Sequence, residues 1–152
     1  MHVVIIGNGI AGINVASGLA SAETVSVEVF TAESHPLYSR VRLPEVLSGS
    51  SMSTDITFYK PEWYEKKGIT VHTGVPVQRI NPQQKEITLN DGRCVSYDFL
   101  VLAMGASANH PQLDGAALNG VFTMRTLDDV ARIREYCASY PETASVIGGG
   151  LL

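Results

Sequence analysis

The sequence predicts a mixed α/β fold, in which a parallel β-sheet is accompanied by a three-stranded antiparallel meander. Residues 2–6 form a short apolar run rich in β-branched side chains, which is typical of a parallel strand buried on both faces. Helix-like and strand-like segments alternate after it. Three short strand-like segments then follow within 77–97, where Asn-Asp-Gly at 90–92 marks a tight hairpin. Together these patterns predict one helix-covered sheet and a second, smaller one.

The N-terminal segment predicts one β-α-β unit. Gly7, Gly9 and Gly12 punctuate the sequence Gly-Asn-Gly-Ile-Ala-Gly directly after the first strand, and apolar residues then recur at helical spacing. Residues 25–30 predict the second strand. A β-α-β unit of about thirty residues is the mononucleotide-binding half of a Rossmann-like fold.

The remaining elements follow from similar patterns. Pro61 at a first turn and Gly68 after the last residue delimit one helix. The elements expected are a short helix near 45–47, a helix over 61–67, parallel strands over 69–72 and 99–104, meander strands over 77–80, 86–89 and 94–97, and a helix over 127–140.

The C-terminal residues repeat the beginning of the chain. Ile6-Gly7-x-Gly9 returns as Ile147-Gly148-x-Gly150, so we expect a last strand from Ser145 and the start of a second dinucleotide-binding unit that the sequence cuts short. The predicted organisation is the first segment of a dinucleotide-binding domain over 1–107, a connecting segment over 108–143 and the start of a truncated second dinucleotide-binding domain over 144–152.

Composition excludes several classes of function. Apolar residues make up 45% of the chain and charged residues 17%, which predicts a folded globular protein. A net charge of −4 gives no reason to expect nucleic acid or an anionic membrane as partner, and no apolar run is long enough to span a bilayer. We therefore expect a cytoplasmic protein. The scattered histidines predict no metal site, and Cys94 and Cys137 are expected to be ordinary reduced thiols.

The first glycine-rich sequence has a direct mechanical interpretation. Gly7 permits the tight turn off the strand, Gly9 lets the backbone approach a pyrophosphate, and Gly12 lets helix and strand pack closely. Ile10 and Ala11 complete the first helical turn, whose N–H groups and partial positive charge favour phosphate. The context of strand, glycine-rich turn and helix predicts dinucleotide binding.

Glu33 is the candidate for binding the ribose. It follows Gly12 by about twenty residues and lies just past the second predicted strand, where such folds place a carboxylate for the ribose hydroxyls. The alternative is an ordinary solvated acid in a loop. No arginine directly follows this strand, so a 2′-phosphate ligand is not indicated at this first site.

Five motifs occur in order along the chain: Val4–Gly12, Tyr38–Leu43, Tyr97–Ala106, Arg125–Asp129 and Gly148–Gly150. With them the chain resembles the pyridine nucleotide-disulfide oxidoreductase superfamily, specifically its rubredoxin reductase, ferredoxin reductase and nitrite reductase large-subunit branch. The resemblance covers the whole sequence. In such enzymes the first glycine-rich sequence binds FAD and the second binds NAD(P)H, so the resemblance implies FAD at the first and a nicotinamide cofactor near Gly148 and Gly150. It thus assigns FAD to the domain over 1–107 and NAD(P) to the one that starts over 144–152.

The resemblance also implies backbone contacts with FAD. The family's usual Ala-Thr-Gly turn appears here as Ala103-Met104-Gly105, in which Met104 removes the threonine side chain and leaves the backbone role intact. Val77 is expected to meet the adenine through its backbone.

Three arginines are implied as well. By the same resemblance, Arg40 or Arg42 lies near the pyrophosphate or flavin, and Arg125 lies near the flavin. The alternative for each arginine is a surface salt bridge.

Positions 38–49 contain no cysteine, although disulfide-reducing members of the superfamily carry reactive thiols there. The flavin would then pass electrons directly to an external acceptor, such as rubredoxin, ferredoxin or a nitrite reductase centre. The expected function is the FAD-binding part of an NAD(P)H-dependent flavoprotein oxidoreductase, with no acid, base or nucleophile identified. The alternative is a non-catalytic dinucleotide-binding fragment, and the fragment by itself is expected to be inactive.

Overall fold

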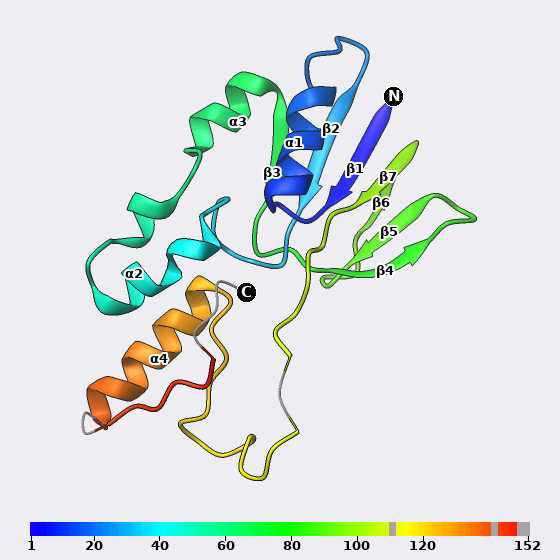
Figure 1. Cartoon of the computed structure of the whole chain (residues 1–152). Helices are drawn as coiled ribbons and strands as arrows, with labels where there is room; N and C mark the ends of the chain where they lie inside the picture. Colours follow the sequence, from blue (N-terminus) through cyan, green and yellow to red (C-terminus); the bar gives the residue numbers. More distant parts are fainter. Residues whose placement is uncertain (110–111, 141–142, 149–152) are drawn as a thin grey trace. The chain divides into compact units, whose positions relative to one another are not determined.

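The computed structural model describes residues 1–109, 112–140 and 143–148. Its larger sheet is parallel throughout, with the strand order β3-β2-β1-β7 (Figure 1). The strands are β1 (His2–Ile6), β2 (Ser26–Phe30), β3 (Ile69–His72) and β7 (Phe99–Leu102). The prediction of a central parallel sheet from these four segments is therefore confirmed.

The meander forms a separate antiparallel sheet in the order β4-β5-β6. Its strands are β4 (Val77–Asn81), β5 (Glu86–Leu89) and β6 (Cys94–Ser96). Ile87 pairs with Ile80 on one side and with Val95 on the other. This alternating register places Ile87 and Leu89 on one face of the meander, where both are fully buried.

The parallel sheet is covered on both faces. Helices α1 (Ile10–Leu19) and α3 (Pro61–Lys67) pack on one face, where Ile13, Ala16 and Tyr64 join a cluster with the side chains of β1, β2 and β3. On the other face, Ile87 and Leu89 of the meander pack against Val4, Ile6 and Phe30. Burial on both faces explains why β1 is continuously apolar from Val3 to Ile6 instead of alternating.

The chain divides into two compact units. The sheets belong to the first, which comprises Met1–Tyr38 and Thr57–Ala106. The second contains the 3₁₀ helices η1 (Arg40–Arg42) and η2 (Ser53–Ile56) and the helices α2 (Leu43–Ser48) and α4 (Leu127–Ser139). Within it, α2 and α4 are in contact, and Arg134 donates from Nη1 to the Val46 carbonyl over 3.4 Å. The division of the sequence at 107 and 143 remains a prediction.

Two expectations about strands are wrong in part. The run over 99–104 was expected to be buried on both faces, but Phe99 is 60% and Leu102 is 56% exposed. The reason is that β7 is an edge strand, paired only with β1 among the described residues. Residues 145–148 form no strand, and Val146 and Ile147 are each 86% exposed. Nothing in the described part of the chain pairs with them, and an unpaired segment cannot satisfy a strand's backbone hydrogen bonds.

No helix among the residues described has the length and apolar character needed to cross a membrane.

Candidate functional site

The glycine-rich loop lies at the carboxyl edge of the parallel sheet. The N–H of Gly7 donates to the Phe30 carbonyl over 2.8 Å, and the N–H of Ala103 donates to the Ile6 carbonyl over 2.8 Å. These bonds continue the strand pairing past the ends of β1, β2 and β7, so the segments that follow these strands meet at one edge. In open α/β sheets this edge is where ligands bind.

The three predicted glycines fall into two kinds. A Cβ on Gly7, whose φ is +110°, would lie 2.2 Å from the Ala103 carbonyl oxygen, and a Cβ on Gly12 would lie 2.0 Å from that of Gly7. A Cβ on Gly9 would have no atom within 4 Å. Gly7 and Gly12 are therefore required by the fold itself, whereas Gly9 faces open space. A side chain at position 9 would fill this space, and its being open fits the close approach of a pyrophosphate to the backbone.

The first turn of α1 is open to an anion. Its N-cap, Gly9, has extended backbone angles and offers no side-chain cap, and the turn contains no acidic residue. Ile10 and Ala11 are exposed at this end of the helix. Helix N-termini carry unpaired N–H donors and a partial positive charge, so this one can hold phosphate oxygens without opposition from a carboxylate.

Glu33 is held in the segment that follows β2. Its N–H donates to Thr31 Oγ1 over 3.3 Å, and its carbonyl accepts from the N–H of Gly74 over 2.9 Å. The Tyr38 hydroxyl donates to Glu33 Oε2 over 2.5 Å. Glu33 is thus not a loosely solvated loop acid, because backbone and carboxylate are both fixed at the edge where the glycine-rich loop lies.

The residues just before Val77 are hydrogen-bonded to the segment that follows β2. The N–H of Val75, two residues before Val77, donates to the Thr31 carbonyl over 2.9 Å. Val77 itself packs at the margin of the cluster beneath the meander, and the register of β4 shifts between Val77 and Arg79. The structure therefore brings the beginning of the meander beside the end of β2, next to Glu33.

The turn after β7 meets the glycine-rich loop directly. Atoms of Ala103 and the backbone nitrogen of Met104 are the nearest neighbours of the Cβ position on Gly7. Gly105 has φ +72°, which favours glycine, and Met104 is 64% exposed. The turn thus places backbone atoms of Ala103 and Met104 beside Gly7, and the Cβ of Ala103 lies 3.4 Å from the Cβ position of Gly12.

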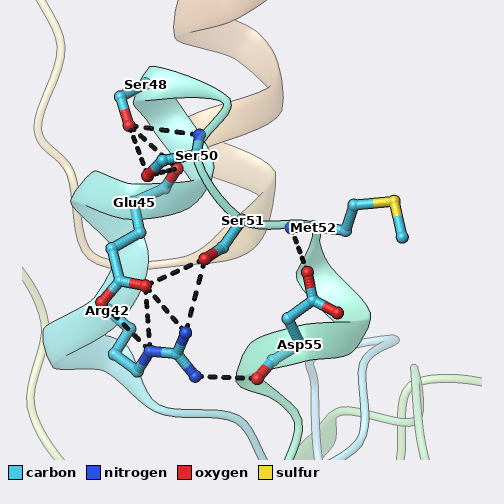
Figure 2. A network of polar contacts seen from close by, with 7 residues as sticks. All are labelled: Arg42, Glu45, Ser48, Ser50, Ser51, Met52 and Asp55. Carbon is cyan, nitrogen blue, oxygen red and sulfur yellow. Dashed lines mark hydrogen bonds and ion pairs between the residues drawn. The ribbon is translucent and has the colours of Figure 1, made fainter.

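In the second unit, Arg42 is fully engaged by its own neighbourhood (Figure 2). Its Nη2 lies 2.7 Å from Glu45 Oε2 and its Nη1 donates to the Asp55 carbonyl over 2.7 Å. Ser51 donates to the same Glu45 oxygen over 2.9 Å. The hydrogen bond from Arg42 holds the pKa of Glu45 below its ordinary value, and that bond likewise raises the pKa of Arg42. This network ties η1, α2 and η2 together (Figure 2).

Arg40 and Arg125 are brought together within the second unit. Arg40 Nη1 donates to the Arg125 carbonyl over 2.8 Å, and the N–H of Arg125 donates to Asp129 Oδ2 over 2.9 Å. Arg40 and Arg125 therefore lie beside each other, whereas Arg42 is engaged by Glu45 and Asp55.

The other candidate positions contribute less. Gly148 is exposed, with φ +93°, and Gly150 lies outside the described residues. Cys94 and Cys137 are free and exposed. Within residues 1–109, 112–140 and 143–148, no group of three or more His, Cys, Asp or Glu side chains could hold a metal ion.

Two residues of this region could not be identified from the sequence. Tyr38 was noted only as part of a motif, and its bond to Glu33 spans a turn whose shape periodicity does not reveal. Asn8 was given no role by the sequence. Its side-chain amide is buried, and neither polar atom has a hydrogen-bond partner among the described residues. An unpaired buried amide is costly, which marks Asn8 as a residue not chosen for stability alone.

Comparison with known proteins agrees with this geometry. The whole chain, residues 1–152, matches the family described as pyridine nucleotide-disulphide oxidoreductase. It is 36% identical over 153 residues to the assimilatory nitrate reductase electron transfer subunit of Bacillus subtilis, and 35% identical over 153 residues to the benzene 1,2-dioxygenase system ferredoxin–NAD(+) reductase subunit of Pseudomonas putida. Each alignment covers 99% of this chain, but only 20% and 37% of those proteins.

A solved structure is similar as well. The crystal structure of NADH:rubredoxin oxidoreductase from Clostridium acetobutylicum superposes with a TM-score of 0.79 at 28% identity, over 91% of this chain and 36% of that one. The chain thus spans less than two fifths of the length of the relatives described.

The fold and the order of motifs agree with the match. The Rossmann-like sheet, the three-stranded meander and the glycine-rich loop are all present in the described residues. Enzymes of this family use FAD and NAD(P)H. The chain therefore belongs to the pyridine nucleotide-disulphide oxidoreductase family, in the branch of the rubredoxin, ferredoxin and nitrite reductases.

Proposed function

We propose that this chain is the FAD-binding part of an NAD(P)H-dependent flavoprotein oxidoreductase that passes electrons to rubredoxin, ferredoxin or a nitrite reductase centre. One observation carries the proposal. Of the three glycines in the first loop, Gly7 and Gly12 leave no room for a side chain, and Gly9 alone leaves open space. Packing within the protein does not require glycine at position 9. The close approach of a pyrophosphate to the backbone would require it.

The chain would hold the ADP half of FAD through three groups. The N–H groups of the first turn of α1 donate to the pyrophosphate. Glu33 accepts from the ribose hydroxyls. The backbone near Val77 borders the adenine, which is supported by the bond between Val75 and Thr31 at the end of β2.

The family resemblance implies a role for arginine side chains. Arg40 and Arg125 are proposed as the arginines near the flavin or pyrophosphate. Arg42 is proposed to hold η1, α2 and η2 in place, because Glu45, Ser51 and Asp55 already engage its guanidinium.

The flavin, when bound, supplies the redox chemistry by accepting a hydride and releasing electrons singly. The chain's own part is to bind and orient it. Positions 38–49 contain no thiol, and the two cysteines are exposed elsewhere on the chain, so no cysteine relay is proposed. This favours an external acceptor. The ferredoxin–NAD(+) reductase and NADH:rubredoxin oxidoreductase among its relatives carry such acceptors in their names.

Titration of the purified chain with FAD and with ADP tests the proposal. We expect the two ligands to compete for one site, since ADP is the part they share. We expect FAD affinity weaker than about nanomolar, because contacts to the flavin come largely from outside the ADP site and each ~1.4 kcal/mol lost weakens binding tenfold. If neither ligand binds at millimolar concentration, the proposal is wrong.

A second measurement separates the enzyme from a non-catalytic nucleotide-binding fragment. FAD-loaded chain is mixed rapidly with NADH while the flavin absorbance is followed. The 152-residue chain is expected to leave the flavin oxidised, because hydride transfer needs the nicotinamide held at close range. A longer protein that includes the second nucleotide site is expected to bleach the flavin. Lack of bleaching in that longer protein would favour the non-catalytic alternative.

A further inference from the structure

Tyr38 is a buried residue whose hydroxyl bonds to Glu33. It is 5% exposed, and its backbone forms an isolated antiparallel bridge with Thr57. Beside it, the N–H of Phe58 donates to the Leu37 carbonyl over 2.9 Å. Its ring meets that of His35 edge to face, with centroids 6.2 Å apart. The ring is therefore fixed in position, and the hydroxyl at its end donates to Glu33 Oε2 over 2.5 Å.

The backbone of Glu33 is fixed independently of Tyr38. Thr31 accepts from its N–H, and Gly74 donates to its carbonyl. These bonds place the Cα but leave the side chain several rotatable bonds, and a glutamate side chain loses much rotamer freedom when it is ordered. The hydrogen bond from Tyr38 restricts the Glu33 side chain to rotamers that keep this contact.

This bond leaves the carboxylate able to accept from a ligand. An ionised carboxylate has about four lone-pair sites on two oxygens, and a tyrosine hydroxyl donates to one of them.

We infer that Tyr38 is a positioning residue for ribose recognition: its hydroxyl presets the Glu33 carboxylate for the 2′-hydroxyl of an adenosine ribose. The inference rests on the proposed function, because it assigns to Glu33 a ligand of the ADP site. It also predicts that the site prefers a ribose with a free 2′-hydroxyl to one with a 2′-phosphate. The Glu33 carboxylate accepts a hydrogen bond from the hydroxyl and repels the phosphate.

The variant Tyr38→Phe isolates the hydroxyl from the packing of the ring. A matched control is available in Tyr64→Phe, because Tyr64 is 6% exposed and its hydroxyl has no hydrogen-bond partner among the described residues. Both substitutions remove one buried hydroxyl from the first unit and keep the ring. Thermal unfolding without ligand measures any purely structural cost of each.

Calorimetric titration of each variant with ADP and with 2′-deoxy-ADP tests the inference. Tyr38→Phe is expected to weaken ADP binding about five- to tenfold, which is the scale of one charge-assisted hydrogen bond, and to leave 2′-deoxy-ADP binding unchanged. Tyr64→Phe is expected to bind both ligands as the wild type does.

Several outcomes would overturn it. Equal weakening of ADP and 2′-deoxy-ADP by Tyr38→Phe would mean a general structural role, and no weakening at all would mean that Glu33 needs no positioning. In both cases wild-type binding of ADP keeps the proposed function standing while the inference falls. If the wild type binds neither ADP nor FAD, the proposed function falls first and the inference with it.

Discussion

Gly12 lies so close to Gly7 that a Cβ on Gly12 would come within 2.0 Å of the Gly7 carbonyl oxygen. The helix thus begins directly against the turn that leaves β1, and only glycine permits this contact. A Cβ on Gly9, by contrast, would have no neighbouring atom within 4 Å, so one short sequence contains two glycines needed to fold and one whose open side is available to a ligand. This division makes the roles of the three glycines separable by mutation.

Gly9→Val is expected to abolish nucleotide binding and to leave the fold intact. The backbone at Gly9 has φ −84° and ψ −178°, an extended conformation that suits a β-branched residue, and its Cβ would enter open space. The added side chain would occupy the region where the pyrophosphate approaches. We expect ADP affinity to fall by about a hundredfold or more, or ~2.8 kcal/mol. Gly18→Val is the control, because a Cβ on Gly18 would also have no atom within 4 Å. Equal ADP affinity in Gly9→Val and in the wild type would contradict the assignment of the pyrophosphate site to Gly9.

Gly12→Ala is expected to show the opposite behaviour. The new methyl group would press on the Gly7 carbonyl, which belongs to a fixed backbone and cannot swing away. Overpacking of this kind typically costs about 1–3 kcal/mol. Urea unfolding followed by the fluorescence of Trp63, the single tryptophan, measures this cost in the unit that contains the loop. A midpoint equal to that of Gly9→Val would mean that the contact between Gly12 and Gly7 is not tight.

Arg42→Met is expected to raise the pKa of Glu45 toward its ordinary value of 4.5. In the wild type the hydrogen bond from Arg42 lowers that pKa, so the stabilisation by the pair is complete above the ordinary value and is lost as the pH falls through the lowered one. The titration of side-chain carboxyl carbons by NMR checks this. Arg93→Met is the control, because Arg93 pairs with Asp91 instead. An unchanged Glu45 titration in Arg42→Met would show that Arg42 does not hold the carboxylate.

Thr126→Ala is expected to loosen the start of α4. Thr126 accepts from the N–H of Asp129 over 3.1 Å, while Asp129 Oδ2 accepts from the N–H of Thr126 over 2.8 Å, which is a reciprocal capping box. Loss of such a cap costs about 1 kcal/mol. Burial acts to raise the pKa of Asp129, but the N–H donors of Arg125 and Thr126 and the Thr126 hydroxyl outweigh it and hold the pKa below its ordinary value.

Amide hydrogen exchange in the first turn of α4 measures this effect. A lower protection factor, which is the intrinsic exchange rate at each pH divided by the observed rate, is expected in Thr126→Ala and, in the wild type, as the pH falls through the lowered pKa of Asp129, because protonation removes the acceptor. Thr126→Ser keeps the hydroxyl and is expected to exchange like the wild type. Equal protection in Thr126→Ala would exclude a stabilising role for the capping box.

The sequence predicts local structure well where one physical signal dominates. The apolar run over residues 2–6 and the glycines after it define a buried strand and a turn, and both are present as predicted. The exposure of Phe99 could not be predicted in this way, because a run of apolar residues does not say whether a strand lies in the middle or at the edge of its sheet. The different surroundings of Arg40 and Arg42 could not be predicted from the sequence either. Both are arginines of one motif, and only the positions of Glu45 and Asp55 show that Arg42 is engaged locally.

The exposed edge at β7 has a practical consequence for handling the protein. A parallel edge strand presents a row of unpaired backbone donors and acceptors, and here Phe99 and Leu102 add exposed apolar side chains beside it. Such an edge is a template on which further chains add strands, so this polypeptide is expected to lose solubility steeply as its concentration rises. Light scattering before each titration then decides the usable concentration range. A lysine introduced at Phe99 should widen that range, since a charged edge residue opposes strand addition.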